Sequence, residues 1–269
     1  MPTAVEKRAA FAALHKDGCF VIPNPWDVGS AIALQHLGFK ALASTSAGMA
    51  WALGLADGAT SRDAVLKHLT ELAEAVDIPL NADFEGGFAT APQGVADSVA
   101  LCVRTGVAGL SIEDSTGEAS DPLFAFSLAV ERIAAAKAAI GASGVLLTAR
   151  SEGFIRGRPD LKETIRRLTA FAEAGADVLY APGLKTEIEV ASVIRAVAPK
   201  PVNILANGMS VSLLAELGAR RISVGGSLAR AAWAGFLAAA RQIAATGDFA
   251  LLAQGTPGGE LNALFAGRG

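Results

Sequence analysis

The sequence predicts a closed parallel (β/α)8 barrel, also called a TIM barrel, and three observations support this fold. Eight short apolar stretches alternate with helical patterns, and they lack the polar alternation of strands that have one exposed face. The third and seventh stretches both begin with Pro-x-Asn, at residues 79–81 and 201–203. Several helices end at a glycine that leads directly into a buried strand, and these glycines are Gly38, Gly106, Gly175 and Gly218.

The expected strands are short and apolar, and turn residues bound them. Pro79 opens the third strand, where its missing N–H costs least. Alternation then places Asn81 and Asp83 on one face of this strand and Ala82 on the other. The expected strands are residues 19–23, 41–45, 79–83, 109–114, 145–150, 178–182, 201–206 and 221–224.

The expected helices begin at capping residues or end at glycine. Residues 90–93, Thr-Ala-Pro-Gln, contain the residues of a capping box, and Asp160 and Thr186 each open a later helix. Helices are expected over residues 4–14, from 28 to near 37, over 60–76, from 93 to near 105, over 127–140, from 160 to 175, from 186, over 210–217, over 228–245 and over 249–265, the last interrupted at 255–259.

One domain is expected over residues 1–269, with a C-terminal helical extension from about residue 227. Barrels of about 250 residues are commonly single domains. A doubly wound open sheet is the alternative. That fold would need a glycine-rich first turn between strand and helix, and residues 24–27 read Asn-Pro-Trp-Asp instead.

The composition excludes several classes of function. A net charge of −3 gives no basic surface for nucleic acid. No run of about 20 apolar residues lacks charge, so no membrane span is expected. Residues 1–16 have no apolar core of a signal peptide. Cys19 and Cys102 lie far apart without ligand spacing and are expected to be reduced thiols of a cytoplasmic protein.

Candidate functional residues lie at the carboxyl ends of the strands, where barrel enzymes place their active sites. These ends carry many carboxylates and one well-placed arginine, but no histidine and no lysine, which argues against imidazole zinc sites, Ser–His catalysis and Schiff-base aldolases. The residues at these ends are Trp26, Asp27, Thr45, Ser46, Asn81, Asp83, Glu85, Glu113, Asp114, Arg150, Ser151, Glu152, Asn203 and 225–227.

Asp83, Glu113 and Glu85 are candidate ligands for Mg²⁺ or Mn²⁺, because hard cations prefer carboxylate oxygens. The alternative is a structural salt network with Arg150. Residues 225–227, Gly-Gly-Ser, open a helix and could hold phosphate, or could simply form a tight turn. Trp26 could line the mouth of the barrel or belong to the core.

Six motifs occur in the order of one superfamily: residues 24–27, 44–48, 81–83, 111–114, 148–150 and 201–205. On these motifs the chain resembles the isocitrate lyase/phosphoenolpyruvate mutase superfamily over nearly its whole length. The resemblance implies a barrel whose last helix is swapped between the subunits of a homodimer or homotetramer. It also implies Mg²⁺ and a small carboxylate substrate, a 2-oxo acid or its enolate.

The resemblance also assigns roles to residues. Asp83 and Glu113 would hold Mg²⁺, partly through water, and Arg150 would bind the substrate carboxylate and enolate oxygen. Asp57 matches an acid near the metal. The expected substrate-binding residues are Trp26, Thr45, Ser46, Ala47, Asn81, Asn203 and Arg150.

Two departures from the superfamily pattern leave the reaction open. Asn81 stands where an aspartate is usual, and Glu85 could restore the missing charge. The loop over residues 115–122 lacks the catalytic Cys of isocitrate-type lyases, and the Lys and Asn of the mutases and phosphonopyruvate hydrolases are missing too. Glu118 is then the candidate acid of this loop. Three hypotheses follow: a Mg²⁺-dependent carbon–carbon lyase or decarboxylase, a phosphonate mutase or hydrolase, and a barrel that binds 2-oxo acids without turnover.

Overall fold

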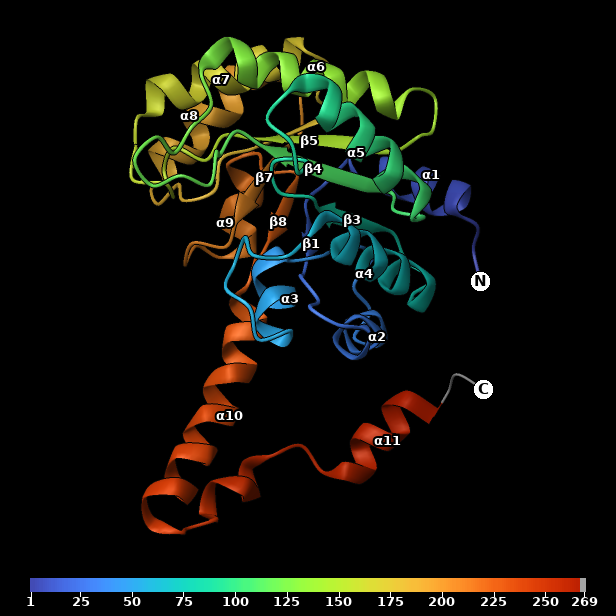
Figure 1. Ribbon diagram of the computed structural model, residues 1–269, viewed down its shortest axis with the longest axis vertical. Coiled ribbons are helices and arrows are strands. Elements are labelled where there is room, and N and C mark those ends of the chain that lie inside the picture. The colour runs from blue at the N-terminus through green and yellow to red at the C-terminus, as the bar shows by residue number, and fades with distance from the viewer. Residues whose placement is uncertain (267–269) are drawn as a thin grey trace.

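Eight parallel strands form a nearly closed barrel in the computed structural model, which describes residues 1–266 (Figure 1). The predicted (β/α)8 fold is therefore confirmed. All eight strands are parallel, most of their residues are buried, and each strand lies within its predicted range. The strands are β1 Phe20–Ile22, β2 Leu42–Ala43, β3 Leu80–Asp83, β4 Gly109–Glu113, β5 Leu146–Arg150, β6 Val178–Tyr180, β7 Val202–Leu205 and β8 Arg221–Ser223.

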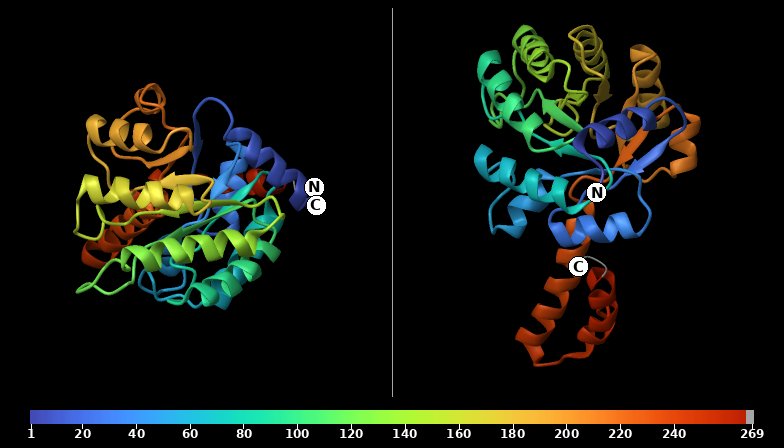
Figure 2. Two further views of the ribbon diagram at one scale, coloured as in Figure 1. Left: turned by 90° about the horizontal axis from the view of Figure 1, so that it is seen from above. Right: turned by 90° about the vertical axis from the view of Figure 1, so that its right-hand side faces the viewer.

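The helices surround the strands and follow the predicted order (Figure 2). They are α1 Ala4–Leu14, α2 Val28–His36, α3 Ser46–Ala52, α4 Arg62–Ala75, α5 Pro92–Arg104, α6 Phe126–Ile140, α7 Leu161–Glu173, α8 Glu187–Val197, α9 Val211–Glu216, α10 Ser227–Thr246, the 3-10 helix η1 Ala250–Gln254 and α11 Gly258–Ala266.

The structure differs from the prediction at two helices. Residues 46–52 form α3, which was not predicted, because the polar residues after β2 indicated only a binding segment. The side chain of Thr45 accepts a hydrogen bond from Gly48 N and is the N-cap of this helix. The capping box at 90–93 does not form. Ala91 is the N-cap of α5, and Pro92 begins the helix, where its missing N–H is tolerated.

Hydrogen bonding between neighbouring strands is not equal all the way around the barrel. Within the described chain, seven neighbouring strand pairs form parallel ladders, from β1–β8 round to β3–β2. The eighth neighbour pair, β1 and β2, has no ladder. A single backbone hydrogen bond of 3.0 Å, from Ala43 N to Pro23 O, joins the two strand ends. We call this junction the β1–β2 seam.

Helix α1 covers the N-terminal end of the barrel. Phe11 is fully buried among Ile22, Ala41, Ala43 and Ala108, which lie in or just before the strands. Gly109 permits this close approach, because a Cβ there would lie 2.6 Å from the Phe11 ring. The floor of the barrel is thus closed by an aromatic side chain, and only the C-terminal ends of the strands remain for a ligand.

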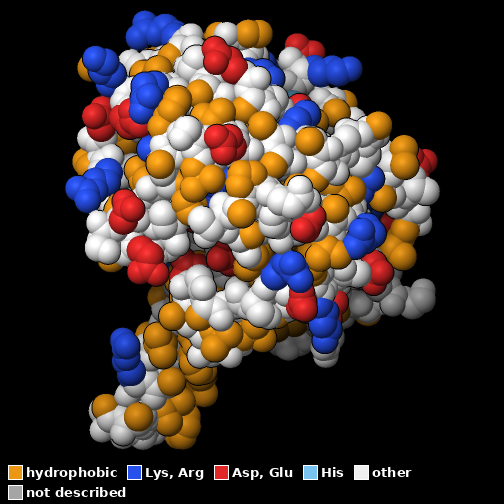
Figure 3. Space-filling view, turned by 45° about the horizontal axis from the view of Figure 1, so that its top comes forward, with side chains coloured by type: hydrophobic (Ala, Val, Ile, Leu, Met, Phe, Trp, Pro, Cys, Tyr) orange, Lys and Arg blue, Asp and Glu red, His pale blue; other side chains and the backbone are white. Residues whose placement is uncertain are grey.

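Helices α10, η1 and α11 form a C-terminal arm that projects from the barrel (Figure 1). Of the 20 residues in α10, only Ala229 is buried. Figure 3 shows hydrophobic side chains gathered on the visible face of the arm. The exposed large apolar side chains of the arm include Trp233, Phe236, Leu237, Phe249, Leu252, Leu261 and Phe265. No helix within residues 1–266 is long and apolar enough to cross a membrane. The predicted swap of the last helix between subunits stays a prediction.

Candidate active site

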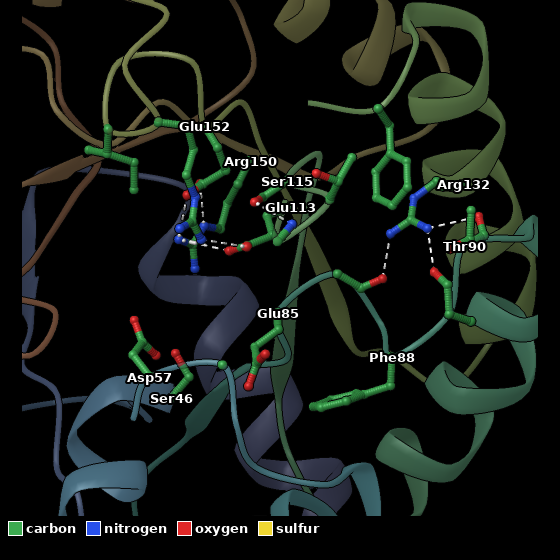
Figure 4. A pocket seen from close by; sticks show the side chains of 18 residues that line it. Ser46, Asp57, Glu85, Phe88, Thr90, Glu113, Ser115, Arg132, Arg150 and Glu152 are labelled. Carbon is green, nitrogen blue, oxygen red and sulfur yellow. Dashed lines mark hydrogen bonds and ion pairs between the residues drawn. The ribbon is translucent and has the colours of Figure 1, made fainter. Parts of the chain in front are cut away.

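A cavity of about 540 Å³ opens at the carboxyl ends of β3, β4 and β5, where the sequence predicted the site (Figure 4). We call it the mouth cavity. Charged side chains gather around Arg150 on one side of it, which we call the charged side, and Phe88 and Arg132 lie on the other (Figure 4). The charged lining residues are Asp57, Glu85, Glu113, Glu152, Arg132, Arg150 and Arg156, and the large apolar ones are Phe88, Phe124 and Ile155.

Arg150, the last residue of β5, is the centre of the charged side. Its Nη1 lies 2.7 Å from Asp83 Oδ1, and its Nη2 lies 3.1 Å from Glu113 Oε2. Its Nε donates to Glu152 Oε1 at 2.9 Å, and Nη2 donates to Glu152 Oε2 at 3.2 Å. Burial opposes the charge of Arg150, but Glu152, Glu113 and Asp83 outweigh it and raise the pKa of Arg150. The guanidinium therefore stays protonated.

Asp83 links Arg150 to the start of α3. Its Oδ2 accepts hydrogen bonds from both the backbone N–H and the hydroxyl of Ser46, each 3.0 Å long. Two hydrogen bonds from neutral donors and one ion pair fix the orientation of this carboxylate. Ser46 lines both cavities and its hydroxyl contacts Asp83, and its predicted role in substrate binding stays a prediction.

Two further carboxylates of the mouth cavity carry raised pKa values. Burial, followed by the charges of Asp83 and Asp57, raises the pKa of Glu85 to about 7. Burial, followed by the charge of Glu152, raises the pKa of Glu113. Arg156 reaches Glu113 Oε1 at 3.4 Å. The side chains of this region thus include more acids than the nearby guanidinium groups balance.

The backbone at Glu85 is strained. Its φ is +47°, a left-handed conformation that side chains other than glycine adopt at a cost. The carboxylate is directed to the mouth cavity, where Thr60 Oγ1 donates to it over 3.4 Å. A strained backbone that holds an acid in a cavity wall indicates a functional role for that acid.

The acids fit a divalent cation that keeps much of its hydration. An excess of buried carboxylates favours a cation of charge +2, and Mg²⁺ typically takes one or two carboxylates and several waters. Among the described residues, no group of three His, Cys, Asp or Glu side chains is placed to hold one metal ion directly. Asp83, Glu85 and Glu113 therefore do not form a closed cage, and any site here would depend on water and substrate oxygens.

A second, smaller cavity of about 160 Å³ extends below Arg150 into the barrel. We call it the lumen cavity. It shares Ser46, Asp57, Arg150 and Ile155 with the mouth cavity. The polar residues that line it more deeply are Asn24, Ser44, Thr45, Asn81, Ser111, Tyr180, Asn203, Arg221 and Ser223.

The predicted site residues fall into three groups. Asp57, Glu85, Glu113 and Arg150 line the mouth cavity, and Ser46, Asp83, Thr45, Ala47, Asn81 and Asn203 line the lumen cavity or both. Trp26 lines neither cavity and packs beside Gly48. Glu118 is exposed in the 115–122 loop and lines neither cavity, although Ser115, Thr116 and Gly117 of the same loop line the mouth cavity.

Sequence reasoning missed three residues of the site. Glu152 was noted at a strand end but given no role, although its position two residues after Arg150 was a usable signal. Tyr180 ends β6, and its ring lies under Arg150 at 5.3 Å. Arg132 lies within α6, and nothing in the sequence indicates that it reaches the cavity. Its guanidinium donates to the carbonyls of Gly86, Ala89 and Thr90 and stacks on Phe124 at 3.9 Å.

Residues 11–244 match the family model described as phosphoenolpyruvate phosphomutase. The chain belongs to the isocitrate lyase/phosphoenolpyruvate mutase superfamily. An uncharacterised Mycobacterium tuberculosis protein is 34% identical over 94% of this chain and 95% of its own length. An oxaloacetate decarboxylase of Paraburkholderia xenovorans is 30% identical over 71% of this chain and 66% of its own length.

Solved structures of the superfamily agree with this assignment. A Burkholderia cenocepacia protein described as a candidate lyase/mutase is 46% identical, with a TM-score of 0.94 over 98% of this chain and 96% of its own. An oxaloacetate acetylhydrolase solved with oxalate is 26% identical, with a TM-score of 0.85 over 97% of this chain and 93% of its own. A 2,3-dimethylmalate lyase is 27% identical, with a TM-score of 0.85 over 98% of this chain and 95% of its own.

Proposed function

We propose that this protein is a Mg²⁺-dependent carbon–carbon lyase or decarboxylase that acts on a small 2-oxo or 2-hydroxy di- or tricarboxylate through an enolate. The superfamily is enzymatic, and its members include 2-methylisocitrate lyase and oxaloacetate decarboxylase. The observation that carries the proposal is Arg150, which stands among Asp83, Glu113 and Glu152 at the base of the mouth cavity.

Asp83 and Glu113 would hold Mg²⁺, partly through water, and Glu85 would supply the negative charge that Asn81 lacks. When bound, Mg²⁺ supplies a Lewis acid that stabilises negative charge on the substrate's oxygens. Mn²⁺ is the alternative cation, since it accepts the same oxygen ligands.

Arg150 would bind the substrate carboxylate. Its guanidinium has five N–H donors, and the contacts with Asp83, Glu113 and Glu152 use four of them. The remaining N–H belongs to Nη1, at the junction of the mouth and lumen cavities. A donor that is already oriented by ion pairs can stabilise developing enolate charge without reorganisation.

Cleavage of the carbon–carbon bond leaves its electron pair on one fragment as an enolate. The reaction is complete when a carbon atom of this enolate accepts a proton. For oxaloacetate, this reaction converts one substrate and one proton into pyruvate and carbon dioxide. Asp57 lines both cavities, which supports a role in which it would deliver that proton directly or through water. Glu118 would reach the site only if the 115–122 loop moved inward.

The experiment is a turnover assay on a panel of acids with Mg²⁺, with a chelator as the control. Oxaloacetate, 2,3-dimethylmalate, 2-methylisocitrate and phosphonopyruvate are each incubated with the protein, and the products are measured by chromatography. Magnesium-dependent cleavage of a carbon–carbon bond is expected. Cleavage of phosphonopyruvate alone would favour phosphonate chemistry, and tight binding without turnover would favour a binding barrel.

A further inference from the structure

A buried arginine without an acidic partner lies inside the barrel, below the active site. Arg221 is the first residue of β8 and is 3% exposed. Its Nε donates to Asn203 Oδ1 at 2.8 Å, and its Nη2 donates to Thr148 Oγ1 at 2.9 Å. Its Nη1 lies 3.4 Å from His15 Nε2. All three partners are uncharged groups.

His15 does not alter this charge balance. Burial and the neighbouring Arg221 lower the pKa of His15 to about 4, so the imidazole is neutral near pH 7. Its Nδ1 lies 2.8 Å from Phe11 O, which requires the proton on Nδ1 and leaves Nε2 as the acceptor for Arg221.

Two other arginines, Arg150 and Arg167, show what Arg221 lacks. Arg150 has three carboxylate partners, and the buried Arg167 has Asp114 and Glu163. Within residues 1–266, no carboxylate forms an ion pair with Arg221. A buried cation whose partners are all neutral retains much of its desolvation cost, and an anion beside it would offset that cost.

The lumen cavity gives such an anion a place. Arg221 lines this cavity, together with the hydroxyl-bearing Ser223 and Tyr180. The volume of about 160 Å³ equals that of roughly five waters in the liquid. Thr148, which holds Arg221, precedes Arg150 by two residues on β5, so the two guanidinium groups belong to layers roughly 6.6 Å apart.

We propose that the lumen cavity binds a small carboxylate or halide anion against Arg221. The anion would accept hydrogen bonds from the guanidinium N–H groups that Asn203, Thr148 and His15 do not use. Its source is either a free ion or the second carboxylate of a dicarboxylate whose first carboxylate meets Arg150. Only the latter source rests on the proposed function, because the former requires no turnover.

Bromide is the probe for the test, because its position can be seen by anomalous diffraction. Crystals of the unaltered protein soaked in bromide are expected to show an anomalous peak beside the Arg221 guanidinium. A lumen cavity that holds only water under these conditions would overturn the proposal. This measurement needs no variant, so it does not depend on the stability of an altered barrel.

Substitution then tests the residue. Bromide is expected to raise the melting temperature of the parent, and Arg221→Met should weaken bromide binding by about tenfold or more, because it removes a charge-assisted hydrogen bond. Arg220→Met is the matched control, since Arg220 donates to Gly18 O at the surface and should leave bromide binding unchanged. Equal bromide binding by the parent and Arg221→Met would also overturn the proposal.

Competition identifies the source of the anion. If the second carboxylate of a substrate occupies the site, oxaloacetate will displace bromide from Arg221, and pyruvate will not. If a free ion occupies it, oxaloacetate and bromide will bind together. If the protein turns over none of the acids in the panel but still binds bromide at Arg221, the proposed function is contradicted and the anion-site proposal is not.

Discussion

Arg150 Nη1 and Asp83 Oδ1 lie 2.7 Å apart, so one ion pair ties β5 to β3 across the strand between them. That intervening strand, β4, contributes Glu113 to the same guanidinium. The charged side of the mouth cavity is therefore one connected unit spanning three strands. Substitutions in this unit should affect ligand binding and the stability of the barrel together.

Replacement of Asp83 by alanine should remove Mg²⁺-dependent binding of 2-oxo acids. A hydrated cation held by few carboxylates loses most of its affinity with one of them. Isothermal titration with Mg²⁺ and oxalate measures the effect. Asp63→Ala removes a surface acid of α4 and is the control. If Asp83→Ala binds both ligands as tightly as the parent, the metal site lies elsewhere.

Replacement of Arg150 by lysine should weaken oxo-acid binding by more than about tenfold, although the charge is kept. The planar guanidinium meets three carboxylates at once, whereas an ammonium is a point charge with three donors. Arg150→Met should also lower the free energy of unfolding by about 3 kcal/mol, because it leaves buried acids unpaired. Titration and chemical denaturation measure the two effects, with Arg62→Lys as the surface control. An unchanged dissociation constant for Arg150→Lys would remove Arg150 from the substrate site.

Asp57→Asn should lower kcat more than Glu118→Gln does, because Asp57 lines both cavities and Glu118 lines neither. Each change keeps the shape of the side chain and removes its acid function. Steady-state kinetics on the substrate found in the panel compares the two variants. A larger loss in Glu118→Gln would mean that the 115–122 loop closes and delivers the proton.

Since the 115–122 loop lacks Cys, isocitrate and 2-methylisocitrate should not be cleaved at a normal enzymatic rate.

Glu85→Gly should stabilise the protein by about 1 kcal/mol while lowering activity. Glycine adopts a φ of +47° without the strain that Glu85 bears there. Glu85→Gln keeps the strained backbone and removes only the charge, so the pair separates the two effects. Thermal denaturation and kinetics are the measurements. A Glu85→Gly variant that is both less stable and fully active would contradict this account.

The C-terminal arm should mediate assembly into dimers or tetramers at micromolar concentration. An exposed apolar surface of this kind commonly marks a subunit interface. Sedimentation velocity measures the assembly, and Phe236→Asp together with Phe249→Asp should reduce it. Ile188→Asp on α8 changes a side chain that is 76% exposed and serves as the control. A parent protein that sediments as a stable monomer would contradict the prediction.

Much of the fold was predictable because it depends on local signals. Apolar runs and helix-ending glycines placed the eight strands, and the acids at the strand ends placed the site. The features that the sequence did not indicate depend on contacts between residues of different helices and strands. Arg132 reaches the mouth cavity only because α6 packs beside the turn after β3, and the hydroxyl of Ser46 contacts Asp83 only because α3 begins directly after β2. Asn203 lines the lumen cavity, and the contacts of its amide with Ser223 and Arg221 could not be read from the sequence either.

The β1–β2 seam should give the two sides of the site different mobility, because the strands on either side of it are bonded unequally. Strand β2 is two residues long. One backbone hydrogen bond, from Ala43 N to Pro23 O, and one from the Asn24 side chain to Ser44 O join its end to that of β1. The amide hydrogens of β2 should exchange with solvent faster than those of β4 and β5, whose ladder extends over five residue pairs. Outward motion of β2 and α3 would break the two hydrogen bonds between Ser46 and Asp83 and leave the ion pairs of Arg150 in place. A ligand could then enter or leave beside α3 while the charged residues on β3, β4 and β5 keep their positions.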